Sequence, residues 1–290
     1  MLPPLKVTNL HVSYPTPRGV VKAVDGVSFT VNEGERFGLI GESGSGKSTI
    51  ALALMRLIRP PGRIDSGEVL LNGVDLLKLP DDEMRERRLA DIALITQGAM
   101  NSLNPVMRIK HQIIDGMQSH GVRMSSRDWN RRVAELLKQV DLEPEVANLY
   151  PHQLSGGMKQ RVCIAIAISL QPRLIIADEP TSALDVVVQR RVMETLRKVQ
   201  EELGASVILI GHDMGLMAQF ADRVAVMYAG KLVEVDTVHN IFARPQHPYT
   251  RLLMSSIPSL DERNLVSAAA SDPASQPMRP PDELSPTPLP

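Results

Sequence analysis

The hydrophobic pattern changes along the chain, and the changes mark different kinds of structure. Apolar residues alternate loosely with polar ones over 5–14 and 20–31, and turn-forming residues close both runs. Alternation of this kind predicts half-buried β-strands, and a further strand pair is expected near 67–72. Other runs are short and mostly apolar, which is typical of strands buried in a sheet: 36–40, 91–96, 173–178, 206–210, 223–227 and 231–235.

Helical spacing of apolar residues alternates with these runs. Helices are expected at 47–58, 186–203 and 213–220. Between about 102 and 169 the helical period dominates, with Ile109, Ile113 and Met117 on one face. Strands that alternate with helices predict an α/β fold, and the long helical stretch predicts a helical insert within it.

Composition divides the chain into three parts. The α/β pattern covers 1–240, including the insert at about 102–169, and short helical pieces follow over 241–258. Residues 259–290 are rich in proline, serine and alanine and contain no aromatic residue. Such a segment cannot bury enough apolar surface to offset its ordering entropy, so we expect a flexible tail.

Charge and cysteine content exclude several classes of function. The 32 Lys and Arg residues nearly balance 33 Asp and Glu, so the chain lacks the basic footprint of a protein that chiefly binds nucleic acid. The single cysteine, Cys163, cannot make an internal disulfide or a Cys-ligated zinc or iron–sulfur centre, and its apolar neighbours predict a buried thiol. No apolar run reaches the roughly 18 residues of a membrane span, and no signal-peptide pattern follows Met1. We therefore expect a cytosolic chain that meets a membrane only through a partner.

A glycine-rich loop carries the strongest chemical signal. It fits G-x-x-x-x-G-K-[ST], follows an apolar strand and precedes a helix, and its candidate phosphate-binding residues are Gly41, Ser43, Gly44, Ser45, Gly46, Lys47, Ser48 and Thr49. Backbone N–H groups of such a loop and the following helix N-terminus favour a polyphosphate. Lys47 would reach the β- and γ-phosphates, Ser48 would bind Mg²⁺, and Thr49 could donate to a more distal phosphate oxygen. A glycine-rich turn that matches by chance is the alternative.

Two acidic residues close the buried strand 173–178. Asp178 ends the strand and Glu179 follows it, so both are expected at the edge of the sheet that holds the phosphate loop. Asp178 would bind Mg²⁺ directly or through water, and Glu179 would polarise the attacking water. The alternative is a charged turn before Pro180.

A second glycine turn precedes a long apolar helix. Ser155 is a natural N-cap, and Gly156 and Gly157 leave backbone N–H groups free at the positive end of the helix. The turn is therefore either a simple helix cap or a second anion site.

The run Leu154–Gln160, which reads Leu-Ser-Gly-Gly-x-x-Gln, resembles the signature of ATP-binding-cassette (ABC) ATPases, and the resemblance extends over about residues 5–240. It implies a P-loop NTPase fold with an antiparallel β subdomain and a helical subdomain, and it implies ATP and Mg²⁺ as cofactors. In this family two cassettes pair head to tail. By this resemblance Ser155, Gly156, Gly157 and Gln160 would contact the ATP held by a partner cassette.

The resemblance assigns four further residues. Tyr14 would stack on adenine, unless it is an ordinary strand aromatic. Gln97 would sense Mg²⁺ and water and begin the segment that couples to membrane subunits. Asp185 would reach across to the other cassette. His212 would contact the γ-phosphate, unless it is only a polar loop residue. No motif is degraded, so we expect a hydrolysing subunit with Glu179, His212 and Gln97 at its catalytic centre.

Two stretches narrow the family. Residues 97–105 resemble the coupling segment of oligopeptide/dipeptide importer ATPases, and residues 244–258 resemble their C-terminal extension. The chain looks like the first of the two ATPase subunits in that group, which implies a second non-identical ATPase, two membrane permeases and an extracytoplasmic substrate-binding protein as partners, and no nucleic acid. The place implied is the cytoplasmic face of the membrane, peripherally bound. No cysteine is available in the extension for the iron–sulfur cluster of some members.

Other functions stay open at this stage. The same group imports nickel, opines and some oligosaccharides. A soluble ABC protein that acts on ribosomes or DNA belongs to another class, but it usually carries two cassettes or a long coiled coil, and an ABC exporter usually lacks the extension. We also expect an exposed permease-docking loop at 100–106, where charged substitutions at Met100 or Leu103 should abolish transport.

Overall fold

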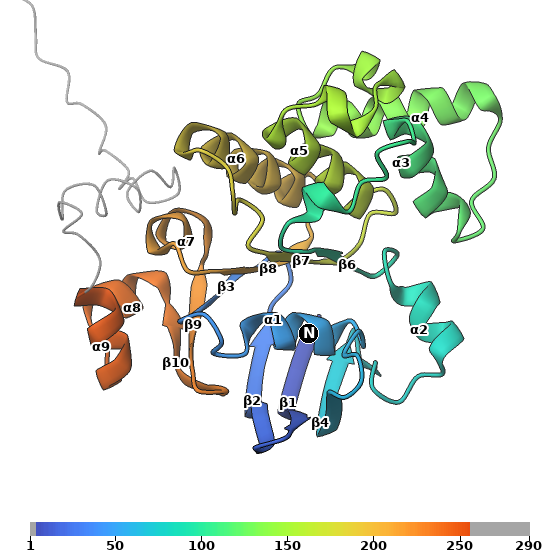
Figure 1. Cartoon of the computed structure of the whole chain (residues 1–290). Coiled ribbons are helices and arrows are strands. Elements are labelled where there is room, and N and C mark those ends of the chain that lie inside the picture. The colour runs from blue at the N-terminus through green and yellow to red at the C-terminus, as the bar shows by residue number, and fades with distance from the viewer. Residues whose placement is uncertain (1–3, 256–290) are drawn as a thin grey trace, which may run out of the picture.

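The computed structural model describes residues 4–255, which form two sheets with helices packed around them (Figure 1). The strands are β1 (Leu5–Thr16), β2 (Gly19–Val31), β3 (Arg36–Ile40), β4 (Arg63–Leu71), β5 (Val74–Asp75), β6 (Ile92–Ile95), β7 (Leu174–Asp178), β8 (Ser206–Gly211), β9 (Arg223–Tyr228) and β10 (Lys231–Thr237). The α-helices are α1 (Lys47–Leu54), α2 (Asp81–Arg87), α3 (Ile109–Gln118), α4 (Ser126–Gln139), α5 (Gly156–Ala167), α6 (Val186–Leu203), α7 (Met214–Phe220), α8 (Val238–Ala243) and α9 (Pro248–Ser255). Short 3₁₀ helices cover Ala99–Asn101, Pro144–Asn148 and Pro151–Gln153. The predicted tail at 259–290 lies outside the described residues.

The larger sheet sets the position of the site. Its strand order is β10-β9-β3-β8-β7-β6, and all strands but β10 run parallel to their neighbours. The carboxyl ends of parallel strands meet at one edge, which is where ligands bind in open α/β sheets. The segments after β3, β6, β7 and β8 therefore converge there, although they are far apart in the sequence.

The smaller sheet is antiparallel, in the order β2-β1-β4-β5, and it faces the larger sheet across α1 (Figure 1). One apolar core fills this layer: Ile50 and Leu54 of α1 meet Leu5 of β1 and Phe37 of β3, all fully buried. The phosphate loop is thus mounted between two packed sheets.

The predicted helical insert is present. Helices α3, α4 and α5 lie together above the larger sheet, on the face away from the smaller sheet (Figure 1). Ser125 caps α4 by accepting a hydrogen bond from the Asp128 N–H, and Trp129, Val133 and Leu136 form its buried stripe. The antiparallel sheet, the helical insert and the mixed sheet together match the expected fold class.

Two elements differ from the sequence predictions. Helix α1 ends at Leu54 rather than 58, because Arg56 takes a left-handed conformation (φ 48°) and Pro60 and Pro61 follow. Helix α2 was not predicted, since Met84 is its one buried residue and leaves no apolar period to detect.

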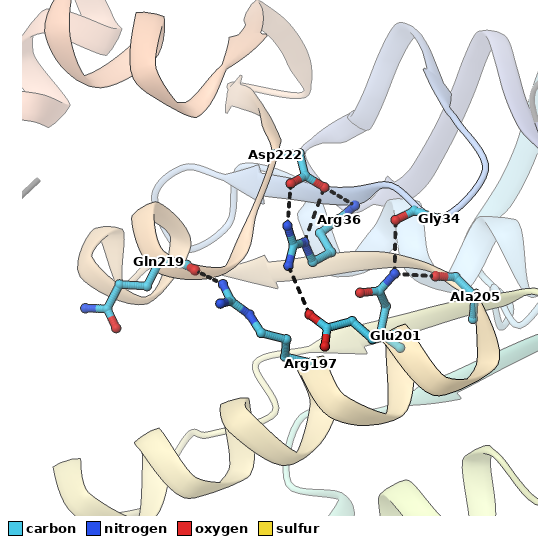
Figure 2. Close-up of polar contacts among 8 residues, drawn as sticks. Gly34, Arg36, Arg197, Glu201, Ala205, Gln219 and Asp222 are labelled. Atoms are coloured by element: carbon cyan, nitrogen blue, oxygen red, sulfur yellow. Dashed lines mark hydrogen bonds and ion pairs between the residues drawn. The ribbon is translucent and has the colours of Figure 1, made fainter. Parts of the chain in front are cut away.

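The C-terminal end of α6 is tied to the sheet by polar contacts (Figure 2). The Arg36 guanidinium donates to Asp222 at 2.7 Å and lies 3.9 Å from Glu201. Arg197 donates to the Gln219 carbonyl oxygen. These contacts join α6 to the start of β3 and to α7, and they join β3 to the turn between α7 and β9, so they fix the start of the strand that leads into the phosphate loop.

The lone thiol lies where α5 packs against the 3₁₀ helix Ala99–Asn101. Cys163 is buried, as predicted, and its Sγ donates to the Ala99 carbonyl oxygen at 3.3 Å. Burial raises the pKa of the thiol to about 12, which keeps it protonated and unreactive at neutral pH.

Among residues 4–255, none of the helices combines the length and apolar character needed to cross a bilayer.

Candidate functional site

The phosphate loop joins the end of β3 to the start of α1, and its first and last glycines are sterically required. Gly41 (φ 148°) and Gly46 (φ 107°) both have positive φ values. A Cβ would collide with the Met227 carbonyl oxygen at Gly41 and with the Ala23 carbonyl oxygen at Gly46. The loop therefore follows a path that only glycine allows.

Lys47 folds back into its own loop. Its Nζ donates to the carbonyl oxygens of Gly41 (2.7 Å) and Glu42 (2.8 Å), and the residue is 6% exposed. Burial lowers the pKa of the ammonium, while the carboxylates of Glu179 and Asp178 act in the opposite direction. The cation is thus held at the centre of the loop, where an anion would be stabilised.

Ser48 and Asp178 form an oxygen-donor pair beside the lysine. The Ser48 hydroxyl donates to Asp178 Oδ1 at 3.2 Å, and Asp178 is only 6% exposed. Burial raises the pKa of Asp178, the nearby Glu179 charge adds to this, and Ser48 and Lys47 oppose it. A buried carboxylate next to a hydroxyl is the kind of hard oxygen set that suits Mg²⁺, which completes its shell with water and phosphate oxygens.

Glu179 lies at the meeting point of three segments. Its Oε2 accepts a hydrogen bond from Gln97 Nε2 at 2.8 Å, and its Oε1 lies 3.1 Å from His212 Nδ1. Gln97 follows β6 and His212 follows β8, so three residues singled out separately in the sequence are in direct contact. A carboxylate held between an amide and an imidazole is well placed to accept a proton from water.

The second glycine turn starts α5. Ser155 caps the helix, with its Oγ accepting from the Met158 N–H at 3.3 Å, and Ser155 and Gly156 are exposed. Gln160 differs: it is 2% exposed, because the helical period places it on the inner face with Gly157. In this structure Ser155 and Gly156 are accessible at the surface and the Gln160 amide is not.

Two other predicted residues have clear local roles. The Tyr14 ring packs against Gly62 in the connection between α1 and β4. Asp185 caps α6, with Oδ1 accepting from the Val188 N–H at 3.0 Å. Stacking of Tyr14 on adenine and contact of Asp185 with a second cassette stay predictions.

The loop after Gln97 is not exposed throughout, so one expectation is corrected. Leu103 is 6% exposed and belongs to the main core, and Met100 is half-buried against Gly156. Val106 is 83% exposed. A charge at Leu103 would disrupt the core rather than test docking.

Sequence reasoning missed two segments that border the loop. Between β9 and β10, the Gly230 N–H donates to the Ser45 carbonyl oxygen at 3.0 Å. From α9, the Tyr249 hydroxyl accepts from the Glu42 N–H at 3.2 Å. No local pattern reveals either contact, since both join parts of the chain that are far apart in sequence.

Comparison with known proteins gives consistent similarities. Residues 24–182 match the ABC transporter family, and residues 233–281 match the family described as the oligopeptide/dipeptide transporter C-terminal region. The dipeptide transport ATP-binding protein DppD of Bacillus subtilis is 44% identical over 98% of this chain and 84% of its own length. The oligopeptide transport ATP-binding protein OppD of the same organism is 44% identical over 97% of this chain and 78% of its own. A solved dimeric ATP-binding cassette in a post-hydrolysis state with ADP and phosphate is 31% identical, with a TM-score of 0.71 over 81% of this chain and 98% of that chain.

Proposed function

The chain belongs to the ABC transporter family of ATPases, and on that premise we propose that it is the ATP-hydrolysing subunit of a peptide importer. The observation that carries the proposal is the presence in one chain of the cassette and of the oligopeptide/dipeptide C-terminal region. Its named relatives transport dipeptides or oligopeptides, which favours peptides as cargo over nickel, opines or oligosaccharides.

The site supports a division of roles in ATP hydrolysis. Lys47 and the loop N–H groups would bind the phosphates, and Ser48 and Asp178 would hold Mg²⁺, with Gln97 as a further ligand. The ion would neutralise charge that develops on the phosphates. Glu179 would orient the attacking water and accept its proton, and His212 would donate to the γ-phosphate. The mutual contacts of Glu179, Gln97 and His212 support this grouping.

We further propose that the ATP-binding site is completed by a second cassette. The exposed Ser155 and Gly156 at the N-terminus of α5 would bind the γ-phosphate held by a partner. ATP would then favour the closed pair of cassettes, because its phosphates bond to both chains. Hydrolysis would remove the γ-phosphate contacts, and the pair would open. The partner proposed is a second, non-identical cassette, in line with the resemblance to the first ATPase subunit of the group.

The remaining proposals concern assembly. Two permeases and an extracytoplasmic binding protein would complete the importer, with this chain bound peripherally to the cytoplasmic face of the membrane. Within the chain we propose a cassette at 1–240, with its helical part at about 102–169, and an importer-type extension at 241–258. The near-neutral charge favours these partners over ribosomes or DNA.

Uptake by the reassembled importer tests the cargo. The chain is co-expressed with its two permeases, second cassette and binding protein, and ATP-dependent uptake of labelled di- and oligopeptides into vesicles is measured. We expect peptides to accumulate and to compete with one another. Uptake of nickel, an opine or an oligosaccharide instead would change the cargo, and co-purification with ribosomes or DNA without permeases would overturn the transporter assignment.

An exposed valine tests the docking loop. Replacing Val106 with aspartate should abolish import, because its apolar side chain is 83% exposed and a charge would be desolvated at a permease interface. Basal ATPase activity should stay within about twofold, since surface substitutions rarely disturb the fold. The matched control is Val20→Asp on the smaller sheet, where the valine is 62% exposed and import should persist. Normal import by the Val106 variant would exclude this loop from docking.

A further inference from the structure

A buried tyrosine from the C-terminal extension contacts the phosphate loop. Tyr249 lies in α9, is 8% exposed, and its hydroxyl oxygen accepts a hydrogen bond from the Glu42 N–H at 3.2 Å. Glu42 is the second residue of the glycine-rich loop. A residue near the end of the described chain is therefore in direct contact with the start of the nucleotide site.

This contact acts on one particular peptide group. The Glu42 N–H and the Gly41 carbonyl belong to the same planar peptide unit. Its N–H donates to Tyr249, and its carbonyl oxygen accepts from Lys47 Nζ at 2.7 Å. The two hydrogen bonds hold the plane from opposite sides, at a glycine (φ 148°) whose backbone would otherwise allow other orientations.

The next peptide group also binds the Lys47 ammonium. The Glu42 carbonyl oxygen accepts from Lys47 Nζ at 2.8 Å and from the Ser45 N–H at 3.2 Å. Rotation of the Gly41–Glu42 peptide would displace the Gly41 carbonyl oxygen, one of the two that hold the Lys47 ammonium. Tyr249 acts on the lysine through the loop backbone and does not touch it.

Tyr249 is itself held firmly. Its ring packs on the Tyr228 ring, with centroids 4.3 Å apart and planes tilted by 37°. At the start of α9, the Glu234 carboxylate accepts from the N–H groups of Gln246 (2.8 Å) and His247 (2.9 Å). The extension is thus moored on β9 and β10, the strands whose connecting turn also borders the loop.

We propose that Tyr249 is a positioning residue for ATP binding: by fixing the Gly41–Glu42 peptide it makes the affinity of the phosphate loop depend on the seating of the C-terminal extension. The inference rests on the loop binding ATP and is independent of the cargo.

The hydroxyl alone can be removed. In the full chain, Tyr249→Phe should raise the KM for ATP about three- to tenfold, the effect of leaving one partly buried N–H without its partner, and should leave kcat within about twofold. The matched control is Tyr228→Phe, which removes a hydroxyl from the adjacent ring and should keep the wild-type KM. A KM within twofold of wild type for Tyr249→Phe, or an equal rise in both variants, would overturn the proposal.

Weakening the contact between Glu234 and the start of α9 provides an independent test. Glu234→Gln weakens the hold on α9 and should also raise the KM, although Glu234 lies in β10. The double variant with Tyr249→Phe should be no worse than the larger single effect, because both act through one contact. Additive effects would separate the two residues and refute the coupling. Absence of ATP binding by the wild-type chain would instead refute the ATPase itself, so the two failures are distinguishable.

Discussion

Replacing Glu179 with glutamine should slow ATP hydrolysis by about 10²–10⁴-fold while ATP still binds. Glutamine has the size of glutamate and can still contact Gln97 and His212, but it cannot accept a proton from water. The phosphate loop is unchanged, so ATP should persist at the interface and closed dimers should accumulate. Single-turnover kinetics measure the first effect, and size-exclusion chromatography with Mg²⁺ and ATP measures the second.

A second glutamate provides a control that removes a negative charge without removing the proposed catalytic base. Glu194 is exposed on α6 and pairs with Arg190 at 3.1 Å, so Glu194→Gln should hydrolyse ATP at the wild-type rate. If Glu179→Gln retained a rate within a few-fold of wild type, Glu179 would not be the base that accepts the proton from water, and its contacts with Gln97 and His212 would need another explanation.

Replacing Asp178 with asparagine should have opposite effects on stability and activity. Burial raises the pKa of Asp178. A carboxyl whose pKa is raised on folding lowers stability as the pH rises from its unfolded pKa through its folded one, so the full cost is present above the folded pKa. Asparagine removes this cost and can still accept from Ser48. The melting temperature of the nucleotide-free chain should rise by about 2–4 °C.

Activity should fall in the same variant. A neutral amide binds Mg²⁺ far more weakly than a carboxylate, so hydrolysis should drop about 100-fold or more. Thermal unfolding without nucleotide and ATPase assays over a range of Mg²⁺ concentrations measure the two effects. The exposed Asp82 on α2 gives a control, since Asp82→Asn should change neither. A lower melting temperature for Asp178→Asn would show that the ionised carboxylate stabilises the fold.

The parts of the site that could be predicted are those written in short stretches of sequence. Gly41 and Gly46 are required by local backbone geometry, and Asp178 ends an apolar strand, so motif and strand pattern place them together. The edge of the sheet where strands end also explains why Gln97 and His212 meet Glu179. Parallel strands bring their carboxyl ends to one place whatever the length of the intervening chain.

The features that could not be predicted depend on contacts across the fold. Leu103 looks like a loop residue from its neighbours, yet it fills the core beside the helical insert. Gln160 belongs to a surface motif but lies on the inner face of α5. Tyr249 reaches the phosphate loop only because α9 is moored on β10, and no local pattern encodes that approach.

Two chain connections join the helical insert to the larger sheet, and their positions define the axis about which the insert would rotate. It leaves after β6 through residues 96–108 and returns to β7 through residues 168–173. Since β6 and β7 are hydrogen-bonded parallel neighbours, these two connections lie at opposite ends of one strand pair, about 13 Å apart. A rotation of the insert about these two connections would therefore have its axis along the strands. Gln97 lies at one connection and would stay close to Glu179, whereas Ser155, at the far end of α5 and about 18 Å from the other connection, would move furthest.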